Sequence, residues 1–285
     1  MKTIIVPVDF SENANTALKY AIEVAKKEKD LLILLHAYDV NYPTAEAPYS
    51  LLEEIKAEAK KKAQDDLNNL SLQLVSKSGV QCLPMVVEGD PKHVIQDVAK
   101  EKNASLIIMG TKGAGNVLNR VFGSTAAKII EKAVCPVIAV PSRVVMHAPK
   151  KITYATDYLN SDLSNIENVA DFARLFSAQL TILHVANEGR SAEEDKTMMK
   201  NFMDEVNGKI VYNNIAFRIL AGENVEVALE DYIEDNSADM LVMSAHHRSF
   251  FDRILGESVT KRMAYHSAIP LMVFHYNKES SLKLV

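Results

Sequence analysis

The sequence predicts an α/β fold: two tandem copies of a five-stranded, mostly parallel, doubly wound sheet with helices on both faces. Three observations carry this prediction. The two halves of the 285-residue chain repeat each other, short apolar segments alternate with helical patterns in each half, and the apolar segments contain few polar positions. Strands so continuously apolar are buried on both faces, which is typical of parallel sheets covered by helices.

The repeat extends through most of the chain. The segment KTIIVPVDFSENANTALKYAIEVAKK near the start recurs as KITYATDYLNSDLSNIENVADFARLF, and Asp9 thereby matches Asp157. Later segments also recur in the same order, such as LLILLHAYD with LTILHVANE and AVCPVIAVP with SAIPLMVFH. We therefore expect one domain at residues 1–141 and a second at residues 150–280, joined by the short segment PSRVVMHAPK.

Apolar runs and helical periods locate the elements of the first copy. Strands are expected at Ile4–Val8, Leu31–Ala37, Gln81–Val87, Ser105–Met109 and Pro136–Val140. Helices are expected at residues 13–28, 50–76, 91–101 and 124–132. With the strand order 3-2-1-4-5, a ligand crevice would lie beyond the ends of the first and fourth strands, where Asp9 and Gly110 face each other.

A glycine-rich loop follows the fourth strand of the first copy. Gly110 is followed after two residues by Gly113 and, after nine more, by Gly123, Ser124 and Thr125 at a helix start. Glycines allow positive φ and close approach of the backbone, and a helix N-terminus favours an anion, so the pattern indicates phosphate binding. A simple strand-to-helix turn with Ser124 as N-cap remains the alternative. Neither a P-loop nor a dinucleotide fingerprint is present.

Three segments together resemble the universal stress protein family: the opening IIVPVDFSENA, the glycine loop, and the closing GSTAAKIIEKAVCPVIAVP. The resemblance covers nearly the whole chain, and the repeat makes it a tandem, two-domain member. It implies that the first copy binds ATP, with or without magnesium, and that Asp9 contacts the nucleoside end or a metal-bound phosphate. The implied nucleotide-binding residues are Asp9, Ala37, Gly110, Gly113, Gly123, Ser124 and Thr125. A helix-capping role for Asp9 stays open.

The second copy departs from the glycine pattern. Ser244 and His247 replace the first two glycines, the following gap has eight residues, and Glu257 brings negative charge to the helix start. We expect no ATP in this copy, because a side chain and a carboxylate stand where the phosphates would lie. Phe250 and Phe251 either fill the crevice or pack on a neighbouring helix.

Two functions compete on these grounds. The first is an ATP-binding stress-response regulator or interaction module, and the second is a stress-associated interaction protein without nucleotide. Slow ATP hydrolysis ranks third, because no general base or transition-state cation can be placed, and we assign no catalytic residue. No His-x-x-x-His or Cys-x-x-Cys spacing predicts a metal site.

The amino-acid composition limits the kinds of molecule that the protein is expected to bind. There are 32 Lys and Arg residues against 37 Asp and Glu residues, a net charge of -5, so no general attraction to nucleic acid or anionic membranes is expected. No signal peptide or long apolar stretch is evident, and Cys82 and Cys135 suit a reducing compartment, so we expect a cytoplasmic protein.

The last strands of the two copies, Pro136–Val140 and Pro270–Phe274, are apolar edge strands in the proposed order. We expect them to pair and form an internal pseudo-dimer, because an uncovered apolar edge invites association. A homodimer of chains is also compatible with the sequence, and the protein partner is unknown.

Overall fold

The computed structural model describes residues 1–39, 49–112, 122–144, 147–186, 190–222, 224–245 and 269–275. Both halves alternate strands with helices. The first half contains β1 (Thr3–Pro7), α1 (Glu12–Glu28), β2 (Leu31–Tyr38), α2 (Tyr49–Ser78), β3 (Cys82–Glu88), α3 (Pro91–Glu101), β4 (Leu106–Gly110), α4 (Ser124–Lys132) and β5 (Val137–Val140). The second half contains β6 (Lys151–Ala155), α5 (Asn160–Phe176), β7 (Gln179–Ala186), α6 (Ala192–Lys209), β8 (Ile215–Ala221), α7 (Val225–Asn236), β9 (Met240–Ser244) and β10 (Leu271–Phe274).

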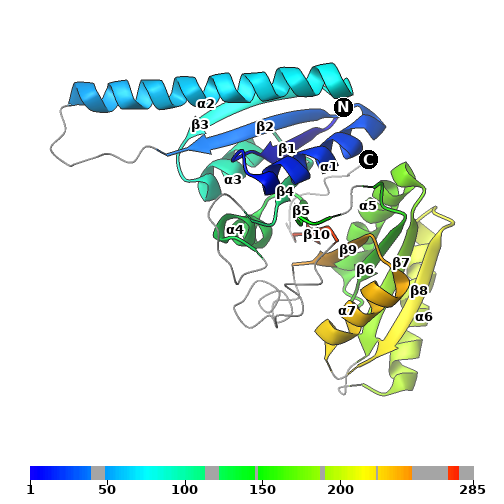
Figure 1. Ribbon diagram of the computed structural model, residues 1–285. Helices are drawn as coiled ribbons and strands as arrows, with labels where there is room; N and C mark the ends of the chain where they lie inside the picture. Colours follow the sequence, from blue (N-terminus) through cyan, green and yellow to red (C-terminus); the bar gives the residue numbers. More distant parts are fainter. Residues whose placement is uncertain are drawn as a thin grey trace.

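Ten strands form one sheet in the order β3-β2-β1-β4-β5-β10-β9-β6-β7-β8. Each half therefore has the predicted order 3-2-1-4-5, and all strand pairs within a half are parallel. Figure 1 shows the two halves side by side, with β5 and β10 between them. The doubly wound α/β fold predicted from the sequence is confirmed.

The junction between the halves is an antiparallel ladder of β5 and β10. The paired positions are Leu271 with Ala139, Met272 with Ile138 and Val273 with Val137. The predicted pairing of the two last strands is therefore confirmed. Both apolar edges are covered, because each strand supplies the hydrogen-bonding partner that the other lacks.

Local signals explain where several helices begin and end. The hydroxyl of Ser11 accepts a hydrogen bond from the amide of Ala14 and caps α1, which ends at Lys29 in the left-handed conformation with φ of 57°. The side chain of Asp90 caps α3, and Pro91 follows at its first turn, where a missing N–H costs nothing. These caps place both helices close to their predicted limits.

Two apolar layers cover the faces of the sheet. Helices α1, α2, α5 and α6 pack on one face, and α3, α4 and α7 pack on the other. The first layer is continuous across the junction, since it includes Leu18 of α1 and Phe172 of α5. Lys27 also lies 5.3 Å from the ring centroid of Phe176 in the other half. Within the described part of the chain, no helix is long and apolar enough to cross a membrane.

Candidate functional site

A cavity of about 290 Å³ lies in the first half, beyond the carboxyl ends of β1, β2 and β4. This is the point where the winding of the sheet reverses, and doubly wound sheets bind ligands there. Its volume is near the lower end of the usual range for ligand pockets, about 300 to 1,000 Å³. It is lined by Pro7, Val8, Asp9, Ala14, Leu35, Ala37, Pro91, Ile95, Met109, Gly110, Lys112, Gly123, Ser124, Thr125 and Ala126.

The fold brings most of the predicted site residues to this cavity. The ones that line it are Asp9, Ala37, Gly110, Gly123, Ser124 and Thr125. The remaining one, Gly113, lies outside the described residues. The parallel strands end at one edge of the sheet, so residues far apart in sequence meet there.

The N-terminus of α4 forms one wall of the cavity. Its N-cap is Gly123, which has no side chain to bond the first-turn amides. The N–H groups of Ser124 and Thr125 have no acceptor within the helix, and the helix dipole adds positive potential at this end. The arrangement suits an anion.

One amide at this wall is already hydrogen-bonded within the protein. The sequence pattern includes the amide of Gly123 among the phosphate donors, but this N–H donates to the carbonyl oxygen of Thr111 at 2.7 Å. The bond ties the N-cap of α4 to the residue that follows β4, so the first-turn amides without a partner in the helix begin at Ser124.

Gly110 permits close contact between the end of β4 and the start of α1. A Cβ atom at this position would lie 3.0 Å from the backbone carbon and oxygen of Asn13. That separation is too short for an ordinary contact, so any larger residue would move α1 away from β4. Glycine is needed here for packing beside the cavity.

Asp9 takes part in the turn that enters α1 and also lines the cavity. Its Oδ1 atom accepts a hydrogen bond from the amide of Ser11 at 3.0 Å. The N-cap itself is Ser11, whose Oγ accepts from the amide of Ala14 at 3.1 Å. Asp9 therefore makes the turn before the cap and is not the cap, while its exposed side chain stays at the cavity wall.

Several lining residues were not found by sequence reasoning. Ala14 comes from α1, and Pro91 and Ile95 come from α3, which packs against α4. Ala14 lies in the opening segment IIVPVDFSENA, but nothing in that segment singles it out, and helix packing places all three residues here. Tyr38 follows Ala37 but does not line the cavity, because successive side chains of a strand point to opposite faces.

The second half places a carboxylate at the position that matches Ala14. This residue is Asp162, which is completely buried. Its Oδ1 accepts from the hydroxyl of Tyr154 at 2.8 Å, and its Oδ2 accepts from the hydroxyl of Thr156 at 2.7 Å. Burial raises the pKa of Tyr154, and the charge of Asp162 raises it further. The Tyr154 hydroxyl therefore keeps its proton and donates it to Asp162.

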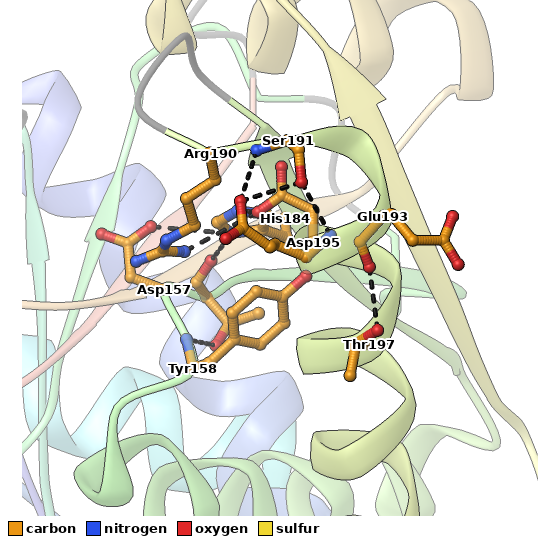
Figure 2. Close-up of polar contacts among 10 residues, drawn as sticks. Asp157, Tyr158, His184, Arg190, Ser191, Glu193, Asp195 and Thr197 are labelled. Atoms are coloured by element: carbon orange, nitrogen blue, oxygen red, sulfur yellow. Dashed lines mark hydrogen bonds and ion pairs between the residues drawn. The ribbon is translucent and has the colours of Figure 1, made fainter.

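A second group of polar residues lies next to this network (Figure 2). The Nδ1 atom of His184 lies 2.8 Å from the carbonyl oxygen of Thr156, and its Nε2 atom lies 3.7 Å from Oδ1 of Asp195. Arg190 approaches the same Oδ1 at 3.8 Å. Asp195 is buried in the first turn of α6, so these contacts join α6 to the ends of β6 and β7.

Most of the second glycine-loop region lies outside the described residues. Ser244 is buried at the end of β9, whereas the predictions for His247, Phe250, Phe251 and Glu257 concern residues outside the described part. In the part of the chain that the structure describes, no three His, Cys, Asp or Glu side chains are grouped so that they could hold a metal ion.

The fold and the cavity define a tandem, doubly wound α/β protein with an anion-suited crevice in its first half. The chain belongs to the universal stress protein family, whose profile matches residues 1–141 and 149–275. Universal stress protein YxiE of Bacillus subtilis is 31% identical over 144 residues, which cover 48% of this chain and 97% of that protein.

Solved structures give a fold-level likeness over the whole tandem chain. A universal stress protein from Archaeoglobus fulgidus matches with a TM-score of 0.73 and 20% identity, covering 96% of this chain and 98% of that chain. Another solved universal stress protein is in complex with cAMP. It matches 45% of this chain and 98% of its own chain, with 21% identity and a TM-score of 0.36.

Proposed function

We propose that the first copy binds ATP or a close adenine nucleotide, with the phosphates at the N-terminus of α4. The observation that carries the proposal is the uncapped first turn of α4, opposite Asp9 at the cavity. Helix N-termini bind phosphate through free amides and the helix dipole. Lys112 lines the same cavity and would offset part of the phosphate charge.

The rest of the cavity suits the nucleoside. Ala37, Ile95 and Met109 provide apolar surface for a base, in line with the mostly apolar walls of ligand pockets. Asp9 is the carboxylate among the described lining residues, and it would contact the ribose or a magnesium ion carried by the phosphates. Magnesium would neutralise phosphate charge, while Asp9 would orient the ligand.

The nucleotide would act as a signal. Occupancy of the crevice would change the surface that the protein presents to an unidentified partner, which makes the protein a stress-response regulator or interaction module. Hydrolysis needs a positioned base, and Asp9 already accepts a hydrogen bond from the Ser11 amide. We therefore place ATP binding ahead of ATP turnover.

The second copy would remain free of ATP. The buried Asp162 occupies the position of Ala14 and adds a negative charge close to where phosphates would approach. This supports the asymmetry predicted from His247 and Glu257. The chain would thus bind about one nucleotide under simple one-site binding.

Calorimetric titration of the full chain with ATP tests the proposal. Ser124→Glu places a carboxylate at the start of α4, at the position where the repeated sequence of the second copy has Glu257. We expect ATP affinity to fall about tenfold or more, equivalent to about 1.4 kcal/mol. Ser50→Glu is the matched control, because Ser50 is exposed in the first turn of α2 and does not line the cavity.

Mass spectrometry of ligand released from freshly purified protein would identify the natural occupant. The binding proposal fails if ATP does not bind the unmodified chain, or if Ser124→Glu and Ser50→Glu bind it equally well. The first of those results would favour the alternative function, a stress-associated interaction protein that holds no nucleotide.

A further inference from the structure

Helix α4 connects the proposed nucleotide crevice with the second half of the chain. Its first residues, Ser124 and Thr125, line the cavity. Near its other end, the carbonyl oxygen of Ile130 lies 2.5 Å from the Nε2 atom of His275, which directly follows β10. One short helix therefore touches the candidate ligand site and a side chain of the other copy.

The contact with His275 supplies a hydrogen-bond donor to a backbone carbonyl near the end of α4. The last four carbonyls of an α-helix have no intrahelical donor, and Ile130 lies within the last turn of α4. A carbonyl accepts hydrogen bonds, so Nε2 carries the proton and donates it. Burial lowers the pKa of His275, and its contacts with the backbone of Ile130 and Cys135 offset part of this effect.

The first copy has no equivalent donor at the position that matches His275. In the repeat, AVCPVIAVP of the first copy matches SAIPLMVFH of the second, so Pro141 stands where the second copy has His275. Proline has no N–H and no side-chain donor. Pro141 therefore has no means of giving a helix of the second copy the hydrogen bond that α4 receives.

A second connection runs beside the first. The chain passes from α4 into β5, and β5 pairs with β10 through Val137 and Val273. The C-terminal half of α4 is thus attached to β10 through the backbone ladder and through the His275 side chain. A displacement of α4 would have to alter one of these contacts.

We infer that His275 couples the nucleotide crevice of the first copy to the second copy by holding α4 in the position that presents its N-terminal amides. The inference rests on the proposed ATP binding and adds the route by which the second copy senses it. Holding the C-terminal end pre-orients the donors at the other end, which favours binding. By linkage, nucleotide binding must then stabilise the contact with β10 to the same extent.

Titration with ATP of three variants of the full chain tests this coupling. His275→Leu keeps much of the side-chain volume and removes the donor, and we expect ATP affinity to fall about fivefold or more. His275→Gln retains an N–H donor, so its affinity should stay within about twofold of the unmodified chain. His147→Leu is the matched control, because this exposed histidine of the joining segment contacts Asp239 and lies outside the cavity lining.

Hydrogen exchange of the unmodified chain supplies a readout that needs no substitution. ATP should slow amide exchange at the cavity and also at residues 129–135 and 271–275. Protection confined to the cavity segments, or unchanged ATP affinity in a folded His275→Leu chain, would overturn the coupling while leaving ATP binding intact. Failure of the unmodified chain to bind ATP would instead overturn the proposed function and the coupling together.

Discussion

The hydroxyl of Tyr154 donates a hydrogen bond of 2.8 Å to the buried carboxylate of Asp162. The first copy has Val6 and Ala14 at the two matching positions, which are both buried and apolar. The same fold therefore contains a polar network in one copy and apolar packing in the other. In the first copy, Ala14 also lines the cavity.

Replacing Asp162 with alanine should lower the free energy of unfolding by about 2 to 4 kcal/mol, because buried donors lose their acceptor. The donors are the hydroxyls of Tyr154 and Thr156 and the amide of Leu159. Urea denaturation measures the change. Asp204→Ala, on the exposed side of α6, should stay within about 0.5 kcal/mol of the unmodified protein. Equal effects of the two substitutions would contradict a structural role for the network.

Gly110→Ala and Gly208→Ala should change stability in opposite directions. A Cβ atom at Gly110 meets the backbone of Asn13 at 3.0 Å, so we expect a loss of about 1 to 3 kcal/mol and weaker ATP binding. At Gly208 in α6 no atom lies within 4 Å, so alanine should stabilise the helix by about 0.5 to 1 kcal/mol. Chemical denaturation and ATP titration of both variants check this. A stabilising Gly110→Ala would refute the close approach of α1 and β4.

Met272→Lys should break the junction of the two halves. Met272 is fully buried opposite Ile138, and an unpaired buried charge costs about 3 to 5 kcal/mol. We expect scanning calorimetry to give two separate transitions, one for each half. Val211→Lys is the control, because Val211 is 86% exposed. A single transition at the temperature of the unmodified chain would argue against a shared sheet.

The lowered pKa of His275 should make the free energy of unfolding depend on pH. Burial lowers its pKa in the folded protein, so the unfolded chain binds more protons as the pH falls below about 6.5, the ordinary value for histidine. The contribution of His275 to stability should therefore be fully present above that pH and should decline between it and the lowered folded-state pKa. Unfolding measurements from pH 8 to pH 5 should show a smaller decline in His275→Gln. Identical pH profiles for the two proteins would rule out this contribution.

Much of the fold can be predicted from local sequence. Asp90 and Pro91 mark the start of α3, and the apolar runs mark the strands to within a residue or two of their ends. The repeat then implies the same strand order in both halves. These features depend on backbone preferences and on side-chain periodicity, which are properties of neighbouring residues.

The opening segment and the glycine pattern led to part of the cavity lining, since Asp9, Gly110 and Ser124 line it together. The pattern did not distinguish an amide that is open to the cavity from one that is already hydrogen-bonded within the protein. Gly123 donates to Thr111, and this bond depends on how the loop returns to β4. The hydrogen bond from Gly123 to Thr111 is a long-range contact, so the local sequence pattern does not predict it.

The amino-acid sequence alone determined the two repeats, their strands and helices, and the chain positions that meet at the first crevice. Only the tertiary structure decided which contacts distinguish the copies: the approach of Gly110 to Asn13, the burial of Asp162, and the hydrogen bond from His275 to Ile130. Each of these depends on how two elements pack across the sheet. Packing is set by the shapes of both surfaces together, whereas periodicity and propensity describe one segment at a time.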